Sequence, residues 1–161
     1  MDDVDHIMRL MDAAFDPHWG EAWTRRQVLD ALQFPYTNYQ LIDGEENFEV
    51  KDLPAAGFTL TRRVADEEEL LLIAVDPSYR KRGIGARLIQ ELVIKARESG
   101  ISRIFLEMRA NNPAKTLYTS FGFEPVGKRM GYYKMRDGNF VDAITYARNV
   151  DKLSNISESF S

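Results

Sequence analysis

The stretch from Val75 to Ala86 reads VDPSYRKRGIGA and places three consecutive cations and two glycines between an apolar run and an amphipathic segment. A helix that begins here offers unsatisfied N–H groups and the positive end of its dipole, which together favour an anion such as a phosphate. Gly83 and Gly85 carry no Cβ, so a bulky anion can approach the main chain. Further charge and hydrogen-bond donors come from Arg80, Lys81, Arg82 and Arg87. A Gly-x-Gly by itself favours the simpler alternative of a turn with solvated cations.

Two common nucleotide-binding motifs do not fit this stretch. A dinucleotide-binding fingerprint requires a third glycine or alanine at a position where this chain has Leu88. The Gly-Lys-Ser/Thr ending of a Walker loop, after its four intervening residues, is absent from the whole sequence. An anion bound here is therefore held by neither of these standard loops.

Two further side chains are candidates for acid–base chemistry. Glu107 is a carboxylate in an otherwise apolar strand, near the carboxyl end of that strand, where it could accept a proton. From the residues alone, an ion pair with Arg103 or Arg109 is the better supported alternative. Tyr118 has a phenol whose ordinary pKa of about 10 keeps it protonated at neutral pH, so it could donate a proton. Its alternative is an ordinary core position on a helix.

The elements that would position these residues follow from the hydrophobic pattern. Apolar residues at helical spacing predict a helix from Val4 to Phe15, and Thr24 caps a second helix that Pro35 ends. Two antiparallel strands follow, with a polar loop between them and a charged turn after them. These segments are Asn38–Ile42, Ala55–Val64, Asp43–Pro54 and Ala65–Glu69, respectively.

The second half of the pattern alternates strands with helices. Leu70–Val75 is a short apolar run of the kind typical of a strand buried on both faces, and a helical stripe runs from Arg82 to Ser99. The remaining elements are a strand at Ile101–Arg109, a short helix opened by Asn112 and Pro113, and strands at Phe123–Lys134 and Val141–Arg148. This order predicts a single α/β (α+β) domain over residues 1–148, with a mixed central sheet and helices on both faces. The polar tail, residues 149–161, is expected to be flexible.

Composition narrows the classes of protein. The chain has 161 residues, a net charge of −4 and no cysteine, which excludes disulfides and cysteine-ligated metals. The acidic balance argues against direct nucleic-acid binding and suits a basic peptide as partner. His6 and His18 are isolated, so no metal site is expected. No apolar run reaches membrane-spanning length and the N-terminus lacks signal-peptide features, so we expect a cytoplasmic protein that does not bind membranes.

Two motifs in this chain carry a resemblance to a known family. Arg80-x-x-Gly83-x-Gly85, between a strand ending in Val-Asp-Pro and an amphipathic helix, resembles the acyl-CoA pyrophosphate loop of the GNAT superfamily of N-acetyltransferases. Downstream, LYTSFGF at Leu117–Phe123 is similar to the Leu-Tyr-x-x-x-Gly-Phe signature of that family. Both motifs stand in the order and spacing of the family, so each supports the other.

Further segments resemble the RimI type of this superfamily, the ribosomal-protein-alanine N-acetyltransferases. They are Asn38–Leu41, Ile73–Pro77, Leu106–Ala110, Tyr132-Tyr133, Asp137-Gly138 and Asp142-Ala143. The chain departs from that type in two places. The loop Asp43–Pro54 is longer than usual, and the loop after Glu107 is one residue shorter, so that either Asn111 or Asn112 takes the cofactor-contacting asparagine position.

The resemblance implies a GNAT fold and an acetyl-CoA-dependent N-acetyltransferase without a metal. It implies that acetyl-CoA contacts the end of a strand, the pyrophosphate loop and one asparagine. These residues are Ile73, Ala74, Val75, Arg80, Lys81, Arg82, Gly83, Ile84, Gly85 and Ala86, with Asn111 or Asn112. It implies Glu107 as general base, acting through an ordered water, Tyr118 as general acid, and a backbone N–H near Val75 as donor to the oxyanion.

The acceptor implied by the resemblance is the N-terminal α-amine, on alanine, of a basic ribosomal protein. An α-amine titrates at about pH 8 and a lysine at about pH 10.4, so an N-terminus needs less help from a base. Trp19, Trp23 and the Tyr132-Tyr133 pair are candidates for lining the peptide groove, with packing an equal alternative. Two other functions remain open: a GNAT enzyme acting on lysine or a small-molecule amine, and a CoA-binding module without catalysis.

Overall fold

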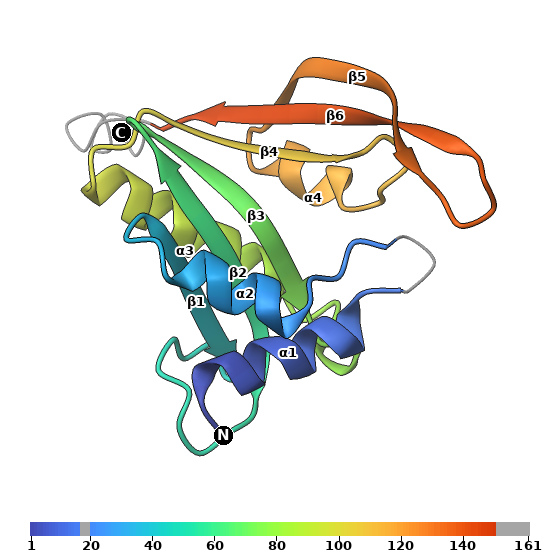
Figure 1. Ribbon diagram of the computed structural model, residues 1–161. Helices are drawn as coiled ribbons and strands as arrows, with labels where there is room; N and C mark the ends of the chain where they lie inside the picture. The colour runs from blue at the N-terminus through green and yellow to red at the C-terminus, as the bar shows by residue number, and fades with distance from the viewer. Residues whose placement is uncertain (17–19, 151–161) are drawn as a thin grey trace. The chain divides into compact units, whose positions relative to one another are not determined.

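The computed structural model describes residues 1–16 and 20–150. Its helices are α1 (Asp3–Ala14), α2 (Arg25–Leu32), the 3-10 turn η2 (Pro77–Tyr79), α3 (Ile84–Glu98) and α4 (Lys115–Ser120) (Figure 1). Its strands are β1 (Thr37–Asp43), β2 (Ala55–Val64), β3 (Glu67–Val75), β4 (Arg103–Arg109), β5 (Glu124–Lys134) and β6 (Phe140–Asn149). The strands form one six-stranded sheet in the order β1-β2-β3-β4-β6-β5. β3 and β4 are parallel, whereas β1–β2, β4–β6 and β5–β6 are antiparallel. This mixed sheet with its helices confirms the predicted fold class.

The residues divide into two compact units. The first consists of Met1–Arg62 and Leu71–Leu88, and the second of Arg63–Leu70 and Ile89–Ser161. The last eleven positions of the predicted tail, 151–161, lie outside the described residues. Among the described helices, none combines the length and the apolar character that crossing a bilayer requires.

In the first unit, helices cover both faces of the strands. Local signals start the two N-terminal helices: Asp2 accepts from the Asp5 amide, and Thr24 forms a capping box with Gln27, as predicted for that threonine. One core joins α1 and α2 to one face of β1, β2 and β3 through Ile7, Leu10, Met11, Val28, Leu41, Phe58, Leu60, Leu72 and Ala74. A second core joins the start of α3 to the other face through Ile42, Ala56, Ile84 and Leu88, with Ile73 and Val75 packed against it. The end of β3 is therefore held between two helical layers.

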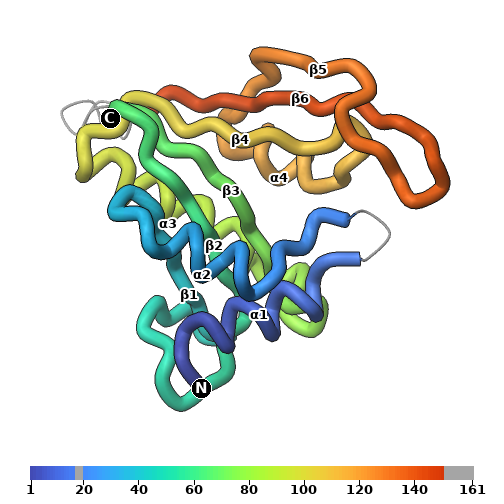
Figure 2. Tube along the Cα trace, in the orientation of Figure 1, coloured from blue at the N-terminus to red at the C-terminus, as the bar shows by residue number. Residues whose placement is uncertain are grey.

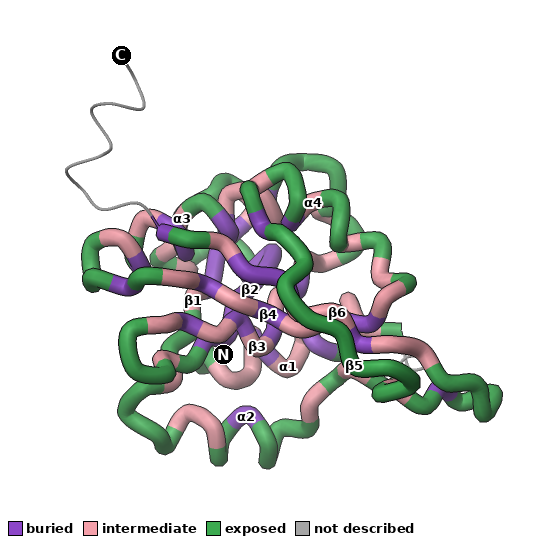
Figure 3. The backbone as a smooth tube through the Cα atoms, turned by 90° about the horizontal axis from the view of Figure 1, so that it is seen from above, coloured by how far each residue is buried: buried purple, intermediate pink, exposed green. Residues whose placement is uncertain are grey.

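In the second unit, β4, β6 and β5 run side by side (Figure 2). β3 begins earlier than the pattern predicts, because Glu67–Glu69 pair with Arg103–Phe105 of β4 instead of lying in a turn. The Arg103 Nε lies 2.5 Å from the Glu67 Oε2, and this ion pair makes a charged residue compatible with the strand. The β3–β4 register runs from the pair Glu67 and Arg103 to the pair Glu69 and Phe105. β5 is one of the two edge strands of the sheet and is exposed along almost its whole length (Figure 3).

Candidate active site

The first unit carries the predicted cofactor segment, which starts at the end of β3 and runs into α3. Ile73, Ala74 and Val75 are the last residues of β3, and Arg80–Gly83 form the turn that follows η2. Lys81 and Gly83 have positive φ angles of 64° and 81°, a conformation that turns successive N–H groups toward one side. The first helical bond of α3 runs from the Arg87 amide to the Gly83 carbonyl, 2.9 Å away. The amides of Ile84, Gly85 and Ala86 therefore have no partner in the helix and are suited to an anion.

The cations of this segment are held in defined places. The Arg80 Nη2 donates to the Ala14 carbonyl at the end of α1, over 3.1 Å. The Arg82 guanidinium lies 5.3 Å from the centre of the Tyr79 ring. The sequence shows that these residues are cationic, but it does not predict that Arg80 contacts the Ala14 carbonyl, 66 positions away.

The long loop between β1 and β2 packs against the same segment. Phe48 places its ring 4.8 Å from the Arg87 guanidinium. A Cβ on Gly44 would stand 2.5 Å from the Cε1 of Tyr79, so the ring rests directly on bare backbone. Asp43 fixes the loop by accepting from the amides of Glu45 and Asn47, each over 2.9 Å. The loop is thus a folded support of the cofactor segment.

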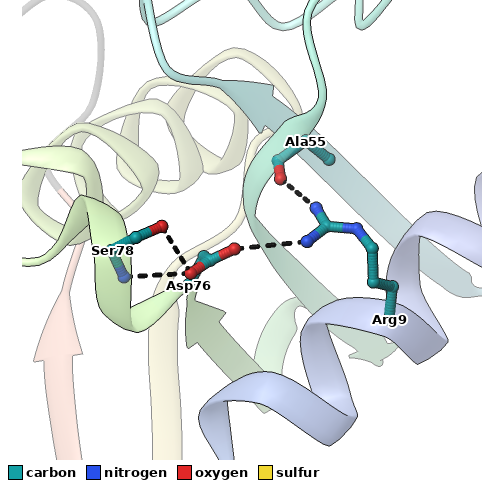
Figure 4. Close-up of polar contacts among 4 residues, drawn as sticks. All are labelled: Arg9, Ala55, Asp76 and Ser78. Carbon is teal, nitrogen blue, oxygen red and sulfur yellow. Dashed lines mark hydrogen bonds and ion pairs between the residues drawn. The ribbon is translucent and has the colours of Figure 1, made fainter.

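Asp76 anchors the turn at its other end (Figure 4). Its Oδ1 accepts from the Ser78 amide and hydroxyl at 2.9 and 2.8 Å, and its Oδ2 accepts from the Arg9 Nη1 at 3.2 Å. Arg9 also donates to the Ala55 carbonyl at the start of β2. The Ser78 donors, and then Arg9, lower the pKa of the Asp76 carboxyl. One carboxylate thereby ties together α1, β2 and the turn that leads to the glycines.

We expect Asp76→Asn to lower the free energy of unfolding at pH 7 by about 1 kcal/mol, because the partly exposed ion pair with Arg9 is lost while the shape is kept. A carboxyl whose folded-state pKa is lowered stabilises the fold above its unfolded pKa and loses this effect as the pH falls through its folded value. The difference from the wild type should therefore shrink below about pH 4. Thermal melts at pH 7 and pH 3 measure it. A difference that is equal at both pH values would contradict the assigned role.

The second unit carries Glu107, on the partly exposed face of β4. The partners suggested by its neighbours in sequence are engaged elsewhere: Arg103 with Glu67, and Arg109 with the Asn111 Oδ1 at 3.0 Å. The Glu107 Oε2 instead lies 3.2 Å from the Arg129 Nε and 3.4 Å from the Thr145 Oγ1. Sequence reasoning missed Arg129, since only the pairing of β4 with β6 and of β6 with β5 brings it to this carboxylate.

Tyr118 lies in the short helix α4 of the same unit, and Asn111 and Asn112 precede that helix. Tyr118 is 5% exposed, and its ring meets that of Phe123 edge to face at a centroid distance of 5.7 Å. The Asn112 Oδ1 accepts from the Ala114 amide at 2.9 Å and so shapes the turn before α4. Both asparagine carboxamide oxygens thus have protein donors. Which of Asn111 and Asn112 contacts CoA stays a prediction, as do the roles of Glu107 and Tyr118.

The aromatic candidates for a peptide groove divide between the units. Trp23 is partly buried and packs against the core beneath α1 and α2, which favours the packing alternative for it. Tyr132 and Tyr133 meet edge to face, with centroids 5.2 Å apart. Trp19, like His18, lies outside the described residues. The described residues contain no group of three or more His, Asp or Glu side chains that could hold a metal ion.

Comparisons with known proteins complete this description. Residues 45–125 match the acetyltransferase (GNAT) domain family. The chain is 37% identical over 126 residues to the [ribosomal protein bS18]-alanine N-acetyltransferase of Escherichia coli K12, covering 78% of this chain and 79% of that protein. It is 32% identical to the Haemophilus influenzae protein of the same name, over 70% and 71% of the two chains. The crystal structure of the ribosomal-protein-S18-alanine N-acetyltransferase from Escherichia coli superposes with a TM-score of 0.77 at 29% identity, covering 92% of this chain and 88% of the other.

Proposed function

The chain belongs to the GNAT acetyltransferase family, and from this premise we propose that it moves the acetyl group of acetyl-CoA to the N-terminal alanine of a ribosomal protein. It is an acetyl-CoA-dependent N-acetyltransferase, as its family implies. The observation that carries the choice of acceptor is its 37% identity, over 78% of its length, to an enzyme named for the alanine of ribosomal protein bS18.

The donor substrate is held mainly by the first unit. The pyrophosphate of acetyl-CoA accepts hydrogen bonds from the amides of Gly83–Ala86 and is attracted by Arg82 and Arg87, the cations beside them. The main chain of Ile73–Val75 pairs with the pantetheine arm as an added strand would. A backbone N–H near Val75 donates to the oxyanion that forms on the thioester carbonyl.

Catalysis requires one proton acceptor and one proton donor. Glu107, through an ordered water, removes the proton of the acceptor's α-ammonium group, and the neutral nitrogen attacks the thioester carbonyl carbon. A C–N bond forms, the nitrogen releases its second proton to solvent through the same water, and the C–S bond breaks. Tyr118 donates its phenolic proton to the departing thiolate, whose conjugate acid has an ordinary pKa of about 8.5. Because the ordinary pKa of the phenol is higher, at about 10, the tyrosinate then takes a proton back from solvent. The products are the acetylated amine and CoA.

We expect the protein to acetylate the α-amine of a basic peptide that begins with alanine and to leave an internal lysine of that peptide almost unmodified. The lysine pKa is more than two units higher than that of the α-amine, so far less of it is neutral at pH 7.5. Raising the salt concentration should weaken peptide binding, because an acidic protein attracts a basic peptide. Mass spectrometry with fragmentation locates the acetyl group.

The matched control is the same peptide with its α-amine chemically blocked. No acetylation of the blocked peptide supports N-terminal transfer. Acetylation of its lysine would replace the N-terminal assignment with a lysine acetyltransferase. If the protein binds acetyl-CoA but modifies no peptide or small amine, the remaining interpretation is a CoA-binding module without catalysis.

A further inference from the structure

The β5–β6 hairpin contains a bulge in the second unit. The register shifts between Arg129 and Tyr133, so Met130–Tyr132 stand opposite the single residue Asp142. Gly131 has a φ of 58°, and its amide donates to the Asp142 Oδ1 over 2.8 Å. Bulges of this kind turn neighbouring side chains away from the direction that regular pairing would give them. The carboxylate of Asp142 therefore fixes the direction of the residues at both ends of the bulge.

The residue before this bulge reaches the candidate base. The Arg129 Nε lies 3.2 Å from the Glu107 Oε2, while the Arg129 guanidinium stands 4.9 Å from the centre of the Tyr132 ring. The Thr145 Oγ1, on β6 between β4 and β5, donates to the same Glu107 oxygen over 3.4 Å. Among the contacts of the described residues, both donors to Glu107 thus engage Oε2 and not Oε1.

The Arg129–Glu107 pair is a weak candidate for stabilising the fold. The Arg129 side chain is 61% exposed and that of Glu107 is 22% exposed. Pairs this open to water contribute little to stability, because solvent screens them and ordering a long arginine costs entropy. The aromatic ring beneath the guanidinium reduces that entropic cost at this one place. The arrangement orders the carboxylate far more than it stabilises the protein.

Resting on the proposed function, in which Glu107 is the base, we infer that Arg129 is a positioning residue for that base. With Oε2 held by Arg129 and Thr145, the carboxylate has one orientation, and Oε1 is presented to the water that receives the amine proton. Orientation of a reacting group governs the rate of the chemical step more than the affinity for substrate. Arg129 should therefore act on kcat through Glu107.

We expect Arg129→Gln to lower kcat about tenfold while KM for acetyl-CoA stays within about twofold of the wild type. Arg129→Lys should recover part of the loss, because an ammonium can still hold the Oε2. Lys134→Gln is the matched control, since it removes one cation from the same strand without touching Glu107, and it should change neither constant. In the Glu107→Gln background, Arg129→Gln should cause no further loss, because a residue that acts through the carboxylate has nothing left to orient.

Three results overturn this inference. They are an Arg129→Gln variant with kcat within twofold of the wild type, an equal loss in Lys134→Gln, and a double variant whose loss is the product of the two single losses. A merely structural role would lower the melting temperature and would add to the loss from Glu107→Gln. If Glu107→Gln itself turns over like the wild type, the base assignment of the proposed function fails, which is a different outcome from additivity.

Discussion

We expect Glu107→Gln to lower kcat at pH 7 by roughly a hundredfold, within the range for loss of a general base, and to leave the affinity for CoA unchanged. The amide has the shape of the carboxylate, so the contacts with Thr145 and Arg129 are altered little in space, but it cannot take a proton. The loss should shrink as the pH approaches 9, because the free α-amine, with a pKa of about 8, then deprotonates without help. Initial rates from pH 6 to pH 9 and calorimetric titration with CoA measure the two quantities.

Glu124→Gln provides the matched control for this experiment. Glu124 is an exposed carboxylate at the start of β5, and its replacement removes the same charge from the same unit. Its pH–rate profile should coincide with that of the wild type. A Glu107→Gln profile parallel to the wild type at every pH would place the base elsewhere.

Gly85→Glu should weaken CoA binding by at least about a hundredfold, or roughly 2.7 kcal/mol. Gly85 lies in the first turn of α3, whose free amides are the proposed pyrophosphate ligands. A glutamate there adds bulk and a negative charge where the anion must approach. The same charge is favourable to the positive end of the helix dipole, so the fold should be preserved. Calorimetry and a thermal melt separate the two effects.

Gln90→Glu serves as the control for charge, because position 90 is exposed further along α3 and the change adds one negative charge with almost no bulk. We expect near wild-type CoA affinity for this variant. A folded Gly85→Glu protein that binds CoA as tightly as Gln90→Glu would remove the loop from the cofactor site.

Local signals in the sequence predict much of the fold. The capping box at Thr24 starts α2, and β2 has the predicted bounds, Ala55–Val64. Both depend on neighbours within a few positions. The assignment of Glu67–Glu69 to a turn was wrong because their partner strand begins 36 positions later, at Arg103. When its cationic partner is distant in sequence, a run of acidic residues has the pattern typical of a solvent-exposed turn.

The candidate site also combines features that neighbouring residues determine with contacts between distant parts of the chain. The glycines and cations of residues 80–86 are adjacent in sequence and could be predicted as an anion-binding segment. The pairing of Glu107 with Arg129 depends on the registers of β4 with β6 and of β6 with β5. The contact of Arg80 with Ala14 depends on how α1 lies against the turn that contains Arg80. Each needs a contact between distant parts of the chain that no local pattern encodes.

The close packing of the Tyr79 ring against the Gly44 backbone also limits how this enzyme can be re-engineered. Any side chain at Gly44 collides with the ring, and Phe48 supports Arg87 from the same loop. A shorter loop without Gly44 and Phe48 would remove both supports at once. A chimera that transplants residues 43–54 therefore has to include residues 79–87 as well. In a library that varies one of these segments and keeps the other constant, we expect most variants to lose the packing between them.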